Sequence, residues 1–165
     1  MSHLDFDVNN FHIPRWNELP NIDLYMDQVL SYIESCLKDY IKVEVNEKII
    51  TKTMINNYVK QNIIQPPVNK KYNRLHIAEL FVICILKQVY SISEVKALIN
   101  LALEANSAEN SYNRFCDYLT ESLISTFNGT EYSEISTLTK EQYLMKNVVQ
   151  SFANKLYAQI VYLNK

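Results

Sequence analysis

Apolar residues recur at helical spacing along much of the chain, which is the pattern of helices that bury one face. The first such stripe consists of Leu30, Ile33, Leu37, Tyr40 and Ile41. Asn21 and Asp23 are both good N-caps, so the pattern predicts a first helix that begins near one of them. The segment 42–50 has no clear period and is expected to be a loop or a frayed continuation of this helix.

A second, shorter helix is predicted from Thr51, its cap, to about Gln61. Its apolar side consists of Met54, Ile55 and Tyr58. A polar and cationic stripe repeats every four residues on another face and consists of Lys52, Asn56 and Lys60. Asn62 follows at the place where a helix often ends in the left-handed conformation, which asparagine tolerates.

Pro66 and Pro67 exclude a helix in the next stretch. Residues 63–72 are therefore expected to hold two short extended segments joined by a basic tip. Asn73 is predicted to cap the following helix, residues 74–89, which is apolar on nearly all sides. Such a helix is normally the buried centre of a helical domain.

Three more helices are predicted in the C-terminal half. Residues 91–94 form a capping box that opens the first of them, and residues 139–142 form a second capping box. The last two helices are expected over about 108–127 and 139–163, with a break at Asn128-Gly129.

The predicted fold class is all-α, in three regions. One Gly and four Pro among 165 residues disfavour tight βαβ turns and sheets of many strands. Residues 1–20 are expected to be an extended arm, 21–104 a winged helix-turn-helix with a small β wing, and 105–165 a C-terminal helical region for dimerisation or effector binding. The arm is expected to dock through Ile13, Trp16 and Leu19.

An acid-free basic segment lies in the middle of a chain whose formal net charge is −2. Residues 48–78 contain neither Asp nor Glu, and their basic residues are Lys48, Lys52, Lys60, Lys70, Lys71 and Arg74. Such a concentration favours an anion-binding surface, for which a nucleic-acid backbone is the commonest partner. The alternative is a chance run of charge on a solvated face.

The order of elements within this segment is the order that a winged helix-turn-helix requires: a short amphipathic helix, a basic loop and a central helix. The residues expected in a DNA groove are Lys52, Asn56, Asn57 and Lys60, because an Asn amide can both donate to and accept from adenine. Those expected on backbone phosphates are Lys70, Lys71 and Arg74. The first hypothesis is thus a transcriptional regulator that binds double-stranded DNA as a homodimer, since one short recognition helix gives little specific affinity.

Several pieces of this region resemble MerR-type transcription regulators. Residues 53–58 and 62–66 resemble their recognition helix and turn, in which the pattern is Thr, apolar, Arg, Tyr, Tyr, then Gly-Leu-Leu and Pro. Residues 70–73 resemble their wing exit, Arg-x-Tyr-Ser, and residues 86–96 resemble the helix that follows. The resemblance implies a DNA-binding winged fold, with a dimerising helix and often an effector pocket towards the C-terminus.

A narrower resemblance is carried by residues 13–28 and 50–60. These are similar to an uncharacterised bacterial family, a domain of unknown function found mainly in low-GC Gram-positive bacteria. That family is regarded as MerR-like through the same motifs, so the resemblance implies the fold more than a function.

Some positions depart from the MerR-type pattern. Asn56 stands in place of the usual Arg, Asn57 in place of a Tyr, and Asn62 in place of the Gly. The segment 42–50 is also longer than a standard turn between the two helices. These departures motivate a second hypothesis, a protein–protein interaction module that has lost DNA readout, with the acidic arm covering the basic segment.

No motif for catalysis, a metal or a cofactor is recognisable, so the chain is expected not to be an enzyme and to need no cofactor. The histidines lack metal-ligand spacing, and His76 is expected at the surface or facing phosphate. The isolated cysteines, Cys36, Cys84 and Cys116, are expected to be small buried hydrophobes in a reducing cytoplasm. Since no apolar run approaches the ~20 residues that span a bilayer, no membrane association is expected.

The C-terminal helices are rich in aromatic residues: Tyr112, Phe115, Tyr118, Tyr143, Phe152, Tyr157 and Tyr162. These residues either form an ordinary core or dimer seam, or line a pocket for a small aromatic effector.

Overall fold

Helices dominate the computed structural model, which describes residues 6–41, 43–130 and 137–163. Two 3-10 turns, η2 (Val8–Asn10) and η3 (Trp16–Glu18), precede the first regular elements. The strands and helices are β1 (Leu24–Tyr25), α1 (Met26–Leu37), α2 (Lys52–Lys60), β2 (Lys71–Tyr72), α3 (Arg74–Leu86), α4 (Ile92–Ala105), α5 (Ala108–Asn128) and α6 (Lys140–Ala158), with a π-helical turn, η4 (Gln159–Leu163), at the end. The predicted all-α class is confirmed.

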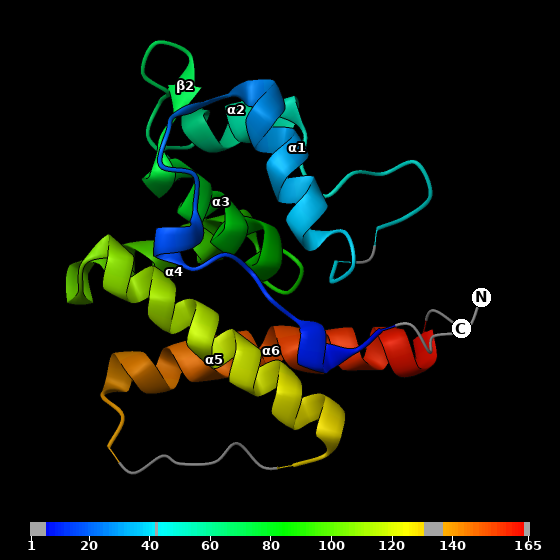
Figure 1. The fold of residues 1–165 in the computed structure, drawn as a ribbon. Coiled ribbons are helices and arrows are strands. Elements are labelled where there is room, and N and C mark those ends of the chain that lie inside the picture. The colour runs from blue at the N-terminus through cyan, green and yellow to red at the C-terminus, as the bar shows by residue number, and fades with distance from the viewer. Residues whose placement is uncertain (1–5, 42, 131–136, 164–165) are drawn as a thin grey trace.

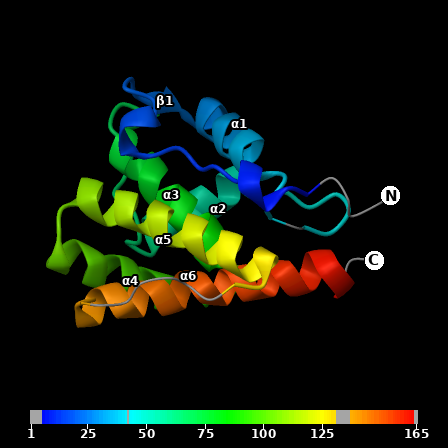
Figure 2. The same cartoon turned by 60° about the horizontal axis from the view of Figure 1, so that its bottom comes forward.

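Helix α3 is the centre of the molecule, as its sequence predicts. Its buried residues face every direction around the helix and include Ile77, Leu80, Phe81 and Cys84. In Figure 1, α1 and α2 lie above α3, and the long helices α5 and α6 lie below it. Figure 2 shows α5 and α6 running beside each other, with α4 at one end of the pair.

The first helix begins later than the sequence predicts. Helix α1 starts at Met26, because Leu24 and Tyr25 form β1 instead of a first helical turn. Leu24 pairs with Tyr72, and Tyr25 pairs with Lys71, in an antiparallel two-stranded sheet. The predicted helix start at Asn21 or Asp23 was therefore wrong. Pairing with a strand far along the chain outweighs the local capping preference of these two residues.

A long connection joins α1 to α2. Helix α1 ends at Leu37, and the described part of 42–50 is irregular, which favours the loop over a frayed helix. The connection is nevertheless anchored, because Ile41, Ile49 and Ile50 are all buried.

The predicted caps are confirmed by their geometry, although α3 ends at Leu86, three residues before the predicted end at residue 89. Each capping side chain accepts a hydrogen bond from the backbone N–H three residues ahead, at Thr51, Asn73, Ser91 and Thr139. Asn62 adopts the left-handed conformation with φ 57°, and Gly129 ends α5 with φ 67°.

The arm folds back onto α5. Ile13 and Leu19 are buried and Trp16 is half-buried, as the sequence predicts. The Tyr112 hydroxyl donates to the Pro14 carbonyl oxygen at 2.6 Å, and the Trp16 N–H donates to Asn113 Oδ1 at 2.9 Å. The first five residues of the arm, His3 among them, lie outside the described residues.

The remaining expectations concern thiols and membranes. Cys36, Cys84 and Cys116 are free thiols; Cys84 and Cys116 are buried and Cys36 is half-buried. Burial raises the pKa of Cys84 to about 12, so this thiol stays protonated at neutral pH. Within the described residues, every helix is too short or too polar to cross a bilayer.

Candidate nucleic-acid interface

Helix α2 separates a buried face from a polar one. Ile55 and Tyr58 are buried, and the predicted base-reading residues are all exposed: Lys52, Asn56, Asn57 and Lys60. Adjacent residues of a helix are about 100° apart, so Asn56 and Asn57, which neighbour the buried Ile55 and Tyr58, point away from the core. The structure therefore brings these four side chains together on one solvent-facing helix.

A tight hairpin forms the basic tip that the sequence predicts between residues 63 and 72. Val68 and Lys71 exchange two backbone hydrogen bonds, of 3.0 and 2.9 Å. Asn69 and Lys70 between them have φ angles of 52° and 64°. Two successive left-handed residues are the mark of a type I′ turn, the turn that matches the twist of a two-stranded hairpin. Lys70 is thereby held at the exposed tip.

Lys70 is strained in this position, because a residue with a Cβ disfavours positive φ by about 1 kcal/mol. Replacing Lys70 by Gly is expected to raise the free energy of unfolding by about 0.5–1 kcal/mol. Urea denaturation at neutral pH measures the change. Lys70→Ala is the control, since it removes the same charge and keeps the strain. Equal stabilities of the Gly and Ala variants would contradict the left-handed turn.

Lys71 and Arg74 are less free than Lys70. The Lys71 ammonium lies 5.1 Å from the centre of the Tyr25 ring, and the Arg74 guanidinium lies 6.0 Å from the centre of the Trp16 ring. Both side chains are half-buried. Both cations contribute to the local positive potential.

The arrangement of these elements places α2 and the hairpin tip at the same end of the molecule (Figure 1). The seven predicted DNA-contacting residues thus fall into three groups: the exposed face of α2, the hairpin at 68–71, and Arg74 at the first turn of α3.

Two lysines that sequence reasoning missed fix α2 in place. The Lys87 ammonium donates to the Ile49 carbonyl oxygen at 2.8 Å and to the Tyr58 hydroxyl oxygen at 3.4 Å. Lys96 donates to the carbonyl oxygen of Gln61, just past the end of α2, at 3.0 Å. The only hint in the sequence is that Lys87 ends an otherwise apolar helix.

His76 is buried, and its prediction as a surface or phosphate-facing residue was wrong. Its Nδ1 accepts a hydrogen bond from the Asn73 N–H at 2.9 Å, so Nε2 carries the proton and donates to the Gln65 carbonyl oxygen at 2.9 Å. His76 therefore completes the cap of α3 and ties the chain before the hairpin to this helix.

The acidic residues described in the arm form their hydrogen bonds and ion pair with other residues of the arm, and they do not cover the basic segment. Asp7 caps the turn η2, accepting from the N–H of Asn9 at 2.9 Å. Glu18 accepts from the N–H of Arg15 at 3.0 Å and pairs with His12, and these contacts lower the pKa of its carboxyl. Neither acid forms an ion pair with a lysine of residues 48–78.

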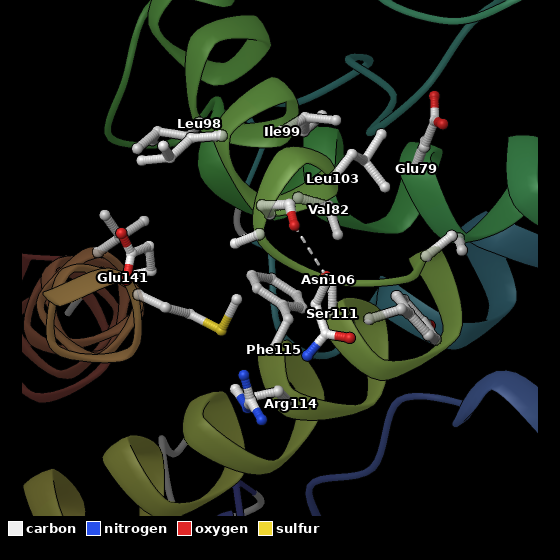
Figure 3. Close-up of a pocket in the computed structure, with 18 of the residues that line it drawn as sticks. Glu79, Val82, Leu98, Ile99, Leu103, Asn106, Ser111, Arg114, Phe115 and Glu141 are labelled. Carbon is white, nitrogen blue, oxygen red and sulfur yellow. Dashed lines mark hydrogen bonds between the residues drawn. The ribbon is translucent and has the colours of Figure 1, made fainter. Parts of the chain in front are cut away.

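A half-open pocket of about 110 Å³ lies elsewhere, among α3, α4, α5 and α6 (Figure 3). Of the seven aromatic residues expected to serve either a core or an effector pocket, Tyr112 and Phe115 line it. Tyr143 and Tyr162 are exposed, and Phe152 is part of the core. The wall is otherwise mainly aliphatic, which does not favour an aromatic effector.

Glu79 is a half-buried carboxyl on the wall of this pocket, and desolvation raises its pKa from 4.5 to about 7. Its proton is therefore held more tightly in the folded than in the unfolded chain, and stability is lost as pH rises from 4.5 through 7. The other charged residues lining the pocket are Arg114 and Glu141.

Glu79→Gln is expected to increase the free energy of unfolding at pH ~8 by about 1–3 kcal/mol, because the amide needs no ionisation. Below the unfolded pKa of 4.5 the gain should vanish. Urea denaturation at both pH values measures it, with the exposed Glu104→Gln on α4 as control. A gain that is the same at both pH values would contradict the desolvated carboxyl.

Comparison with known proteins identifies one family. The profile of the family described as "Domain of unknown function (DUF1836)" matches residues 14–116. The match spans the end of the arm, α1 to α4 and part of α5. No curated protein matches the chain significantly, and neither does any solved structure.

Proposed function

The chain belongs to the DUF1836 family, a domain of unknown function, and from the geometry of its N-terminal half we propose that it is a DNA-binding transcriptional regulator. Helix α2 is the proposed recognition helix, and the hairpin at 68–71 is the proposed wing of a MerR-like winged helix-turn-helix. The observation that carries the proposal is the exposed Lys and Asn face of α2 at the same end of the molecule as the lysine tip of the hairpin.

The order of elements supports a winged arrangement. Strand β1 precedes α1, and β2 follows α2, so their pairing closes a small sheet around the two helices. A recognition helix must be held rigidly, and Lys87, at the C-terminal cap of α3, donates hydrogen bonds to the chain just before α2 and to Tyr58 within it. A wing must be fixed at its base, and His76 donates a hydrogen bond to Gln65 before the hairpin. The connection 38–51 is longer than the usual turn, and its buried isoleucines replace the tight turn as the anchor.

In a groove, Asn56 and Asn57 would meet base edges, with Lys52 and Lys60 beside them on bases or phosphates. Lys70, Lys71 and Arg74 would meet phosphate oxygens. A homodimer in the cytoplasm is part of the proposal, because one short helix supplies little specific affinity. Exposed apolar side chains near the C-terminal end offer a surface for a dimer: Tyr157, Val161, Tyr162 and Leu163.

The test is fluorescence anisotropy with a labelled duplex of promoter length. Lys70→Glu combined with Lys71→Glu is expected to weaken binding by at least about tenfold, because two phosphate contacts become repulsive. Lys140→Glu, an exposed lysine at the start of α6, is the matched control and should bind as the unmodified chain does. Equal binding by all three proteins would refute the proposed wing.

The alternative function is a protein–protein interaction module on the same scaffold. Two large apolar side chains at the hairpin favour this alternative because they are exposed to solvent. Tyr25 is 52% exposed and Val68 is 65% exposed. Asn56 and Asn57 in place of Arg and Tyr point the same way. Under this alternative the Lys70→Glu, Lys71→Glu protein keeps its partner in a pull-down, and the Tyr25→Ser, Val68→Ser protein loses it.

A further inference from the structure

The pocket among α3 to α6 is an apolar site with few free polar groups. Its walls are mainly aliphatic, from residues such as Leu75, Val82, Leu98, Ile99, Met145 and Val148. An apolar pocket of this kind binds the apolar body of a ligand and uses a few polar groups to orient it.

Several polar residues at the pocket already have partners. The Ser111 hydroxyl donates to the Ala102 carbonyl oxygen at 3.1 Å, as the dashed line in Figure 3 shows. Asn106 Oδ1 accepts from the Ser107 N–H at 2.8 Å, and Gln142 Oε1 accepts from the Thr139 N–H at 3.0 Å. The Ser111 hydroxyl thus joins α5 to α4, and the two amide oxygens are used at helix starts, so none of these three atoms is free to orient a ligand.

Apart from the amide nitrogens of Asn106 and Gln142, which are donors, the remaining polar groups of the lining are charged, and their net charge is negative. Glu79 and Glu141 are carboxylates and Arg114 is a guanidinium. Within the described residues, Glu79 has neither a hydrogen-bond partner nor an ion-pair partner, although its carboxyl is half-buried. Figure 3 shows Glu79 on the side of the apolar wall away from Glu141, with Arg114 apart from both. A half-buried carboxylate without a partner is stabilised by a cation or a donor.

We propose that this pocket binds a small amphipathic amine, with its aliphatic body against the leucine and valine wall and its ammonium group on the Glu79 carboxylate. The net charge of the lining selects a cation over an anion, and the aliphatic wall selects an alkyl chain over a ring. The site lies on α3 to α6, away from α2 and the hairpin, so it stands whether or not the chain binds DNA.

Isothermal titration calorimetry of the full chain at pH ~8 with three probes of equal length tests the proposal: n-octylamine, n-octanol and octanoate. Octylamine is expected to bind at least about tenfold more tightly than octanoate, with octanol between them. Glu79→Gln should remove the preference for the amine, and the matched control Glu104→Gln should keep it. Ala102→Phe places a larger side chain in the pocket from α4, so it should weaken the binding of all three probes.

Each other outcome overturns the proposal. If octanoate binds as tightly as octylamine, Glu79 does not bind the ammonium group. The same follows if the Glu79→Gln protein still prefers octylamine to octanoate. If none of the three probes binds, the pocket does not take an amphipathic amine. Where Ala102→Phe fails to fold by circular dichroism, the Glu79→Gln comparison decides alone. DNA binding enters none of these measurements, so a failure here leaves the proposed function standing.

Discussion

Replacing Lys52 and Lys60 together by glutamate is expected to lower affinity for duplex DNA by at least about a hundredfold, or ~3 kcal/mol. Both lysines lie on the exposed face of α2, at its first and last residues, and neither pairs with another described residue. Each change replaces an attraction to DNA by a repulsion, at the proposed centre of the interface. The folded core is untouched, because the buried residues of α2 are Ile55 and Tyr58.

Fluorescence anisotropy at fixed salt measures the loss, with unfolding by urea as a check that the fold is intact. The matched control is Lys38→Glu with Lys140→Glu, which changes the net charge equally at exposed sites outside residues 48–78. A general charge effect would weaken both doubles alike. If α2 itself contacts DNA, the Lys52, Lys60 variant should lose much more affinity than the control variant. Similar losses of affinity in the two variants would contradict the assignment of α2 as the recognition helix.

Replacing Ile13 by Ala is expected to lower the free energy of unfolding by about 2–5 kcal/mol. Ile13 is 0% exposed although it belongs to the arm, so its side chain is part of the core. Truncation loses the transfer free energy of the removed methyl groups and leaves a cavity. Loss of this anchor also loosens Pro14, whose carbonyl oxygen accepts from the Tyr112 hydroxyl.

Urea denaturation measures the effect of Ile13→Ala, and Ile22→Ala is the matched control. Ile22 lies nine residues further along the chain and is 67% exposed, so its truncation should change stability by less than about 0.5 kcal/mol. If the two changes lower the free energy of unfolding equally, Ile13 does not belong to the core and the arm adds little to stability. The predicted difference would instead show that Ile13 of the arm is part of the folded core.

Local signals in the sequence predicted the helices well. Caps at Thr51, Asn73, Ser91 and Thr139 depend on atoms within three residues, so the sequence contains everything that sets them. The left-handed Asn62 and Gly129 are local in the same way. The division into three regions stays a prediction, and so do the DNA contacts of the seven basic and Asn residues.

Features that depend on distant contacts were not predictable. Strand β1 exists because Leu24 and Tyr25 meet the hairpin strand, and local capping preference at Asp23 pointed elsewhere. His76 is buried because Gln65 reaches its Nε2, a contact that no sequence period reveals. The pocket likewise depends on how four helices pack, and its half-buried carboxyl, Glu79, appears in the sequence only as an interruption of an apolar helix.

The central claim is that residues 48–78 form a surface for DNA, and its most direct test is a salt titration of binding by the unmodified chain. If Lys52, Lys60, Lys70, Lys71 and Arg74 contact phosphates, the logarithm of the binding constant should fall linearly with the logarithm of salt concentration, with a slope steeper than about −3. Binding that is flat with salt, or no binding to duplex DNA at any salt concentration, would contradict the account.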